Sequence, residues 1–143
     1  MGLDCSLRGI PLDKVLDEAR TKVVSAMKNG STLVVSMQSS APDFIGKMNS
    51  PNDFPLELFN ASGKDFINVK SEDEGGGMHD KPQTTALFRD ADTAQTAGMA
   101  VCRPDFCVVV TSAFEAADID EYLFKGDYGL PPRDKFAILS VLP

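Results

Sequence analysis

The chain has 143 residues, and its 14 Lys and Arg residues against 21 Asp and Glu residues give a formal net charge of −7 at pH 7. This length is typical of one domain with its own hydrophobic core, so we expect a single domain over residues 1–143. The negative charge repels phosphate backbones, and no cluster of Lys and Arg offsets it. These features disfavour nucleic-acid binding.

Two further classes are excluded by composition. The longest apolar stretches, such as residues 106–110, reach about five residues where a membrane span needs roughly 20, so we expect no transmembrane segment. The three cysteines are an odd number, and no apolar segment follows Met1. Both features disfavour a secreted disulfide scaffold and favour a reducing, cytoplasmic compartment.

The first ten residues show no clear pattern, and we expect them to form a flexible N-terminal segment. A helix is predicted after Pro11, because apolar residues recur at i, i+3, i+4 and i+7 while Arg20 and Lys28 lie off that face. Asn29 and Gly30 should end this helix, since both tolerate the left-handed conformation of a C-terminal cap. The apolar members of the repeat are Leu12, Val15, Leu16, Ala19, Val23, Ala26 and Met27.

Residues 33–37 form a short apolar run rich in β-branched residues, which predicts a strand buried on both faces. A short helix could begin at residues 42–45, with Pro42 in its first turn. Compact irregular structure is expected around Pro51 and Pro55, with at most one helical turn on either side of Pro55. Residues 70–85 are acidic and rich in glycine, which is typical of a surface loop. Residues 86–100 show no clean period.

The strongest strand signal is at residues 106–111, and we expect a central strand there. Helical spacing with acidic residues in the first turn predicts a helix at 115–124. A third strand is predicted at 136–142. Together these elements predict an α/β fold with a mostly parallel sheet of three to five strands, built on the strands at 33, 106 and 136 and flanked by helices.

Catalytic and metal-binding patterns are scarce. His79 is the chain's one histidine, and it lies in the acidic loop. His79, Cys5, Cys102 and Cys107 are all the Cys and His residues that could bind zinc. Cys102 and Cys107 lie on either side of the start of a strand, so we expect buried reduced thiols and no metal. Phosphate-binding glycine motifs are absent as well. The sequence thus predicts no cofactor and no recognisable catalytic set.

Polar residues at the ends of the predicted strands are the candidate ligand site. Ligands of open α/β sheets bind at the carboxyl ends of the strands. Gln38 and Ser39 follow the first strand, and Thr111 and Ser112 end the second. A small molecule would bind near these side chains.

The N-terminus fits a lipidation pattern. Residues 1–6 match M-G-x-x-x-[ST], in which Gly2 is myristoylated, and Cys5 is close enough to take palmitate as the second chain that stable attachment requires. Asp4, the absence of a polybasic segment and the net charge weigh against membrane binding. A cloning-derived Met-Gly is a further alternative.

Two segments, residues 26–35 and 102–112, resemble the second half of an AAA+ module of the kind found in dynein heavy chains and ciliary IQ-and-AAA-domain proteins. In that family a helix ending in Asn-Gly leads into a strand, and a later strand ends at the polar position called sensor 1, which Thr111 and Ser112 match here. The resemblance covers residues 23–44 and 101–143, and it makes the segment from residue 122 to the strand at 136 the next part of the same sheet.

The chain departs from the family pattern in two places. The Walker A half of the module is missing, and Gln38 and Ser39 or their neighbours stand where the Walker B acids would be. The resemblance therefore implies an AAA-like fold without a P-loop and without hydrolysis. Arg133 invites comparison with an arginine finger, although an arginine in a proline-rich loop is usually solvated or paired.

Three functions follow as hypotheses. The first is a non-catalytic, AAA-related scaffold or interaction module that binds protein partners, with a homodimer as the simplest assembly and a cytoplasmic, ciliary or flagellar location. The second is a peripheral membrane adaptor acylated at Gly2 and Cys5. The third is an enzyme or small-ligand binder whose site lies at the carboxyl ends of the strands.

Overall fold

The structure is a computed structural model that describes residues 2–4, 9–59, 86–96, 98, 100, 102–103 and 105–141. The acidic loop predicted at 70–85 lies outside these residues. The strands are β1 (Gly2–Asp4), β2 (Thr32–Gln38) and β3 (Cys107–Ser112), and the helices are α1 (Leu12–Asn29), α3 (Asp90–Thr93) and α4 (Ile119–Leu123). Short 3-10 turns are η1 (Leu56–Phe59), η3 (Ala94–Thr96) and η4 (Arg133–Lys135).

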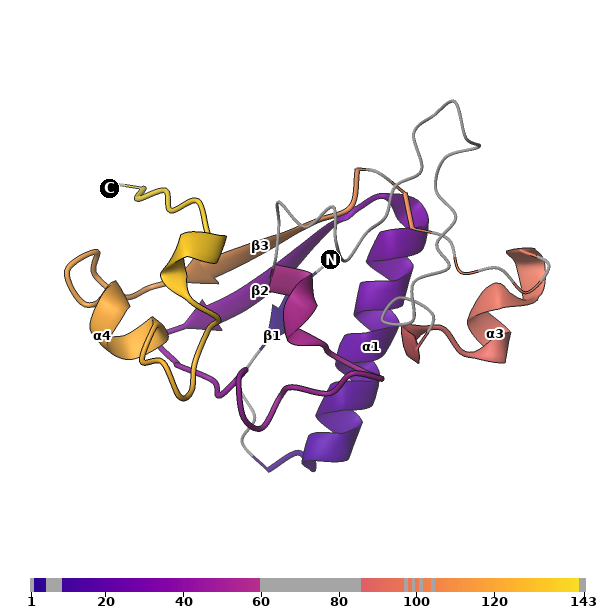
Figure 1. Cartoon of the computed structure of the whole chain (residues 1–143), viewed down its shortest axis with the longest axis horizontal. Helices are drawn as coiled ribbons and strands as arrows, with labels where there is room; N and C mark the ends of the chain where they lie inside the picture. The colour runs from indigo at the N-terminus through magenta and orange to yellow at the C-terminus, as the bar shows by residue number, and fades with distance from the viewer. Residues whose placement is uncertain are drawn as a thin grey trace.

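The strands form a parallel sheet in the order β1-β2-β3 (Figure 1). The β2–β3 pair is its longer part, with Leu33 opposite Val108 and Val35 opposite Val110. The shorter β1 places Gly2 opposite Val34, within the ten residues for which we expected a flexible segment. The predicted α/β class, a small parallel sheet with helices, is therefore confirmed.

Helix α1 supplies most of one wall of the core. Its predicted apolar face is buried at Ala19, Val23, Ala26 and Met27, whereas Val15 and Leu16 are half-buried and Leu12 is exposed. Gly30 adopts the left-handed conformation (φ 63°) that closes the helix, with Ser31 N–H donating to the Ala26 carbonyl at 2.9 Å. Leu33, Val35 and Met37 of β2 belong to the same buried cluster. No helix in the described part of the chain is long and apolar enough to cross a membrane.

Aromatic side chains complete the core beside the sheet. Phe44, Phe54 and Phe59 are buried, with ring centroids 5.2 to 5.8 Å apart, and Phe136 reaches the cluster at 5.9 Å from Phe59. Such contacts stabilise beyond the area that they bury. They hold the segment 42–59 beside the sheet. Residues 42–45 form no helix, whereas the compact irregular structure expected around Pro51 and Pro55 is confirmed, with one 3-10 turn after Pro55.

Three strand predictions are corrected. Residues 136–140 form no strand, because η4 and the Phe136 ring hold the start of this segment at the aromatic cluster, away from any partner strand. The strand at 107–112 is an edge strand with alternately exposed and half-buried residues, where we expected a central one. The strand β2 is fully buried on one face only.

Candidate functional site

The carboxyl ends of β2 and β3 bring the predicted ligand residues to one end of the sheet. Gln38 pairs with Ser112 in the strand register, and Thr111 lies opposite Ser36. Ser39 follows in a turn. This convergence is what parallel pairing of the two strands requires.

Backbone groups occupy much of the bonding capacity at this end. The carbonyl of Gln38 accepts the Ala113 N–H at 2.8 Å and the Ser112 hydroxyl at 3.4 Å. The Ser112 hydroxyl in turn accepts the Phe114 N–H at 3.1 Å. Gln38 has a positive φ of 50°, next to a bulge in the strand register. These bonds end the strands and turn the chain. The side chains of Gln38 and Thr111 are exposed, so they do not line an enclosed site.

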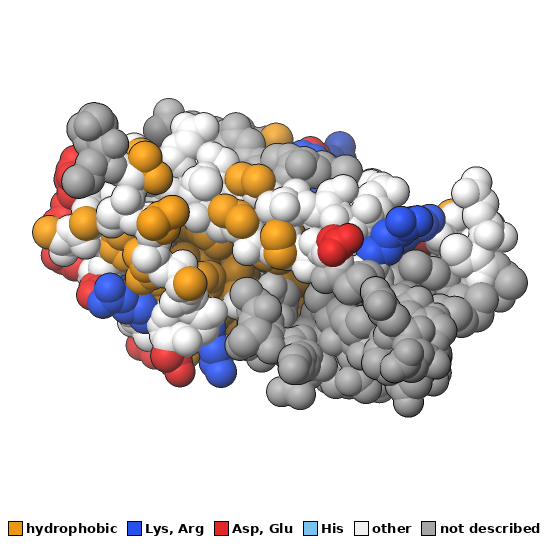
Figure 2. Space-filling model, turned by 90° about the horizontal axis from the view of Figure 1, so that it is seen from above, with side chains coloured by type: hydrophobic (Ala, Val, Ile, Leu, Met, Phe, Trp, Pro, Cys, Tyr) orange, Lys and Arg blue, Asp and Glu red, His pale blue; other side chains and the backbone are white. Residues whose placement is uncertain are grey.

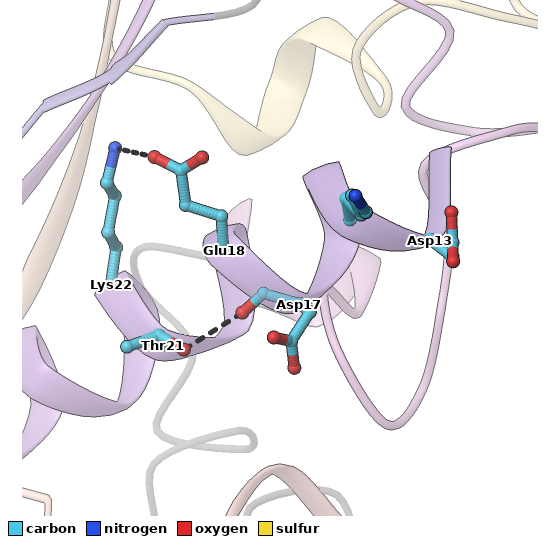
Figure 3. A pocket seen from close by; sticks show the side chains of 6 residues that line it. Asp13, Asp17, Glu18, Thr21 and Lys22 are labelled. Atoms are coloured by element: carbon cyan, nitrogen blue, oxygen red, sulfur yellow. Dashed lines mark hydrogen bonds and ion pairs between the residues drawn. The ribbon is translucent and has the colours of Figure 1, made fainter. Parts of the chain in front are cut away.

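Two hollows lie elsewhere on the surface. The first, about 540 Å³, is an open surface along the outer side of α1, where Lys22 pairs with Glu18 at 2.7 Å and the Thr21 hydroxyl donates to the Asp17 carbonyl at 2.9 Å (Figure 3). Four of its six lining residues therefore bind one another along a single helix. Among the described residues, no group of three or more Cys, His, Asp or Glu side chains could hold a metal ion.

The second hollow, about 330 Å³, lies between α4 and η4 and contains Arg133. The guanidinium of Arg133 donates to Asp120 at 2.8 Å, and both side chains are more than half exposed. The paired alternative for Arg133 is therefore observed. Phe124 and Leu130 form the apolar floor of this small hollow.

The cysteines differ from one another. Cys102 is buried, and burial raises the pKa of its thiol to about 12, which makes it unreactive. Cys107 is exposed on β3, with its sulfur 3.3 Å from Thr32 Oγ1. The expectation of buried thiols is correct for Cys102 and wrong for Cys107, because β3 is an edge strand. Cys5 and His79 lie outside the described residues.

An ion network that the periodicity missed connects α1 to α3. Arg20, which the pattern placed off the apolar face, is only 6% exposed. Its Nη1 donates to the Leu87 carbonyl at 3.0 Å and to Asp92 Oδ2 at 2.7 Å. Lys28 adds a bond to the Asp92 carbonyl.

The Asp92 carboxylate is stabilised in its charged form. Burial raises the pKa of Asp92, but the Arg89 N–H, the Arg20 guanidinium and the charge of Lys28 outweigh burial and lower it below the usual 3.8. The partners are 72 residues apart in the chain. No local spacing signals such a pair, and its geometry indicates a structural role.

Exposed aliphatic side chains occur on β3 and on the last described residues of the chain. We call this set the edge surface and define it by Val109 of β3 together with Ile138, Leu139 and Val141. Their exposed fractions are 43%, 41%, 87% and 87%. Within the described chain β3 pairs with β2 alone. Figure 2 shows hydrophobic side chains gathered on the face seen from above, where β3 and the last described residues lie in Figure 1.

No protein-family model, curated protein or solved structure matches the chain.

Proposed function

We propose that this chain is a non-catalytic interaction module that binds protein partners through the edge surface. The observation that carries the proposal is the exposure of large aliphatic side chains on β3 and residues 138–141, together with a β3 edge that pairs with no strand other than β2 in the described part of the chain. Contiguous exposed apolar patches mark interaction sites, and an open strand edge offers a row of backbone donors and acceptors to a further strand. The edge surface combines the two features.

The polar candidates support binding chemistry less well. The Ser112 hydroxyl and the Gln38 carbonyl are engaged in bonds that end the strands. Each hollow contains an ion pair between two of its lining residues, Lys22 with Glu18 in the first and Arg133 with Asp120 in the second. Neither arrangement leaves a convergent set of unsatisfied polar groups of the kind that small-molecule sites contain.

The proposal includes a degenerate AAA-related origin, with a sheet of three to five strands and no P-loop. Its support is the placement of the residues that carry the resemblance. Helix α1 ends at Asn29 and leads through Gly30 into β2, and β3, which carries Thr111 and Ser112, lies beside β2 in parallel. On this proposal the module works in the cytoplasm of a cilium or flagellum.

Photo-crosslinking tests the proposed surface. A photoreactive amino acid replaces Val109, and a matched control replaces Thr21, which is exposed on the polar side of α1. Both proteins are irradiated alone and with a cell extract. We expect crosslinked protein species from position 109 and none above background from position 21. Equal crosslinking from the two positions contradicts the proposal.

A thermal-shift titration tests the small-ligand alternative. Mg-ATP, Mg-ADP or Mg-GTP at about 100 times its dissociation constant would add roughly 2.7 kcal/mol of stability, a shift of several degrees for a domain of this size. We expect no shift. A shift that is lost in Thr111→Ala/Ser112→Ala protein favours a ligand site at the sheet end over an interaction module.

A further inference from the structure

The edge surface has two halves, and they are complementary. One half is the outer edge of β3, a strand of six residues. The other is the segment 137–141, which has no helix or strand assigned and follows Phe136, a residue with extended backbone (φ −118°, ψ 138°). This segment carries the most exposed aliphatic side chains of the described chain, Leu139 and Val141. An exposed strand edge and an exposed extended segment satisfy each other by β-strand addition.

Charge narrows the choice of partner. The stretch from Phe106 to Ala113 and the stretch from Phe136 to Val141 contain no charged residue. A strongly charged peptide would find no counter-charge on either half. Each half matches an uncharged apolar strand, and this chain itself carries one.

The position of the segment favours a second copy over the chain's own edge. Phe136 is anchored by ring contacts with Phe59 and Phe124, at 5.9 and 5.6 Å. From there the segment runs past the carboxyl end of β3 and away from the sheet (Figure 1). Pairing with its own β3 would require it to reverse direction, whereas the edge of another copy can meet it where it lies.

We propose that two copies of this chain exchange segment 137–141, each adding it as a strand to the open edge of the other's β3. The inference rests on the proposed function and names its partner. Reciprocal exchange uses the same surfaces on both copies, so the assembly closes as a two-fold dimer. It also covers the strand edge, which would otherwise be an aggregation hazard.

Sedimentation of the full chain over a wide concentration range tests the dimer. In Leu139→Ser/Val141→Ser protein we expect the dissociation constant to rise by about a hundredfold, because burial of each aliphatic side chain is worth roughly tenfold. The matched control is Ile10→Ser, which removes an aliphatic side chain of 52% exposure far from the edge surface. An Ile10→Ser effect as large as that of the double variant overturns the proposal.

Salt gives an independent readout. Each copy carries a net charge of −7, so two copies repel, and the contact contributes no attractive ion pair. Screening should therefore strengthen the dimer as salt rises. A dimer that weakens with salt contradicts an uncharged interface.

Disulfide trapping identifies the occupant. Neighbouring strands place residues within disulfide distance, and Cys107 starts β3. If segment 137–141 pairs with β3 in an antiparallel direction, the new thiol of Val141→Cys protein lies near Cys107. If the pairing is parallel, the new thiol of Ala137→Cys protein lies there instead. We expect one variant to oxidise to a covalent dimer, with the intermolecular linkage shown by mixing isotope-labelled and unlabelled protein.

The outcomes separate the two proposals. A disulfide within one chain shows that the segment folds back, and it overturns the exchange while leaving the interaction module intact. If the protein is a monomer at every concentration and position 109 crosslinks a different protein, the exchange is also overturned and the interaction module is left intact. A monomer with neither disulfide nor crosslink overturns both.

Discussion

Removal of the Arg20 guanidinium should destabilise the protein far more than removal of an exposed charge from the same helix. We consider Arg20→Met, which keeps a long unbranched side chain with a similar helix propensity. The substitution deletes the hydrogen bonds to Leu87 O and Asp92 Oδ2, at 3.0 and 2.7 Å. It leaves a carbonyl and a carboxylate without the partner around which they are arranged.

The magnitude follows from the burial of the groups. A hydrogen bond between charged groups contributes about 1.5–3 kcal/mol and a bond to a carbonyl about 1 kcal/mol. The Asp92 side chain keeps 22% of its surface exposed, so water restores part of its solvation when Arg20 is lost. We therefore expect the free energy of unfolding to fall by about 2–3 kcal/mol, below the 3–5 kcal/mol typical of a fully buried pair.

The matched control is Lys22→Met. Lys22 lies on α1 and pairs with Glu18 at 2.7 Å across one helical turn; the Lys22 side chain is 28% exposed and the Glu18 side chain 64%, against 7% and 22% for Arg20 and Asp92. Exposed pairs of this spacing contribute only about 0.3–0.5 kcal/mol. The comparison therefore separates a buried from an exposed ion pair on one helix.

Urea unfolding followed by circular dichroism measures both variants, together with Asp92→Asn and the double variant Arg20→Met/Asp92→Asn. The cycle should give a coupling energy of about 1–3 kcal/mol. If Arg20→Met loses no more stability than Lys22→Met, or if the coupling energy is zero, the ion network does not attach α3 to α1 as argued.

Three further predictions concern single residues. Gly129→Ala (φ 89°) would place Cβ 2.6 Å from a carbonyl oxygen at the end of α4, whereas the Cβ of Gly126→Ala (φ 82°) meets nothing within 4 Å. Thermal unfolding should show that the free energy of unfolding falls by about 1–2 kcal/mol for Gly126→Ala and by clearly more for Gly129→Ala. Equal losses would contradict the clash. A thiol reagent should label Cys107 in the native protein and Cys102, with its raised pKa of about 12, only on unfolding; equal rates would contradict the assigned burial. Because the folded pKa of Asp92 is lowered from 3.8, its contribution is present above that value and is lost as pH falls through the folded pKa. The stability difference between wild type and Asp92→Asn should therefore shrink in acid urea titrations, and a difference independent of pH would refute the lowered pKa.

Local patterns were enough to predict α1, its cap at Gly30 and the strand β2. Each depends on residues within a turn or two of one another: the apolar spacing that buries one helical face, the residue that tolerates a left-handed conformation, and a run of β-branched side chains. The same reasoning located the candidate ligand residues, since parallel strands bring Gln38 and Ser112 to one end of the sheet.

Contacts between distant segments decided the rest. Residues 136–140 have the composition of a strand, but the Phe136 ring holds the start of this segment at the aromatic cluster, and the segment pairs with no described strand. Arg20 lies off the apolar repeat of α1, yet it is buried and pairs with Asp92, 72 residues away. Periodicity reports which side chains can share a face, whereas pairing and burial depend on which faces and edges meet in three dimensions.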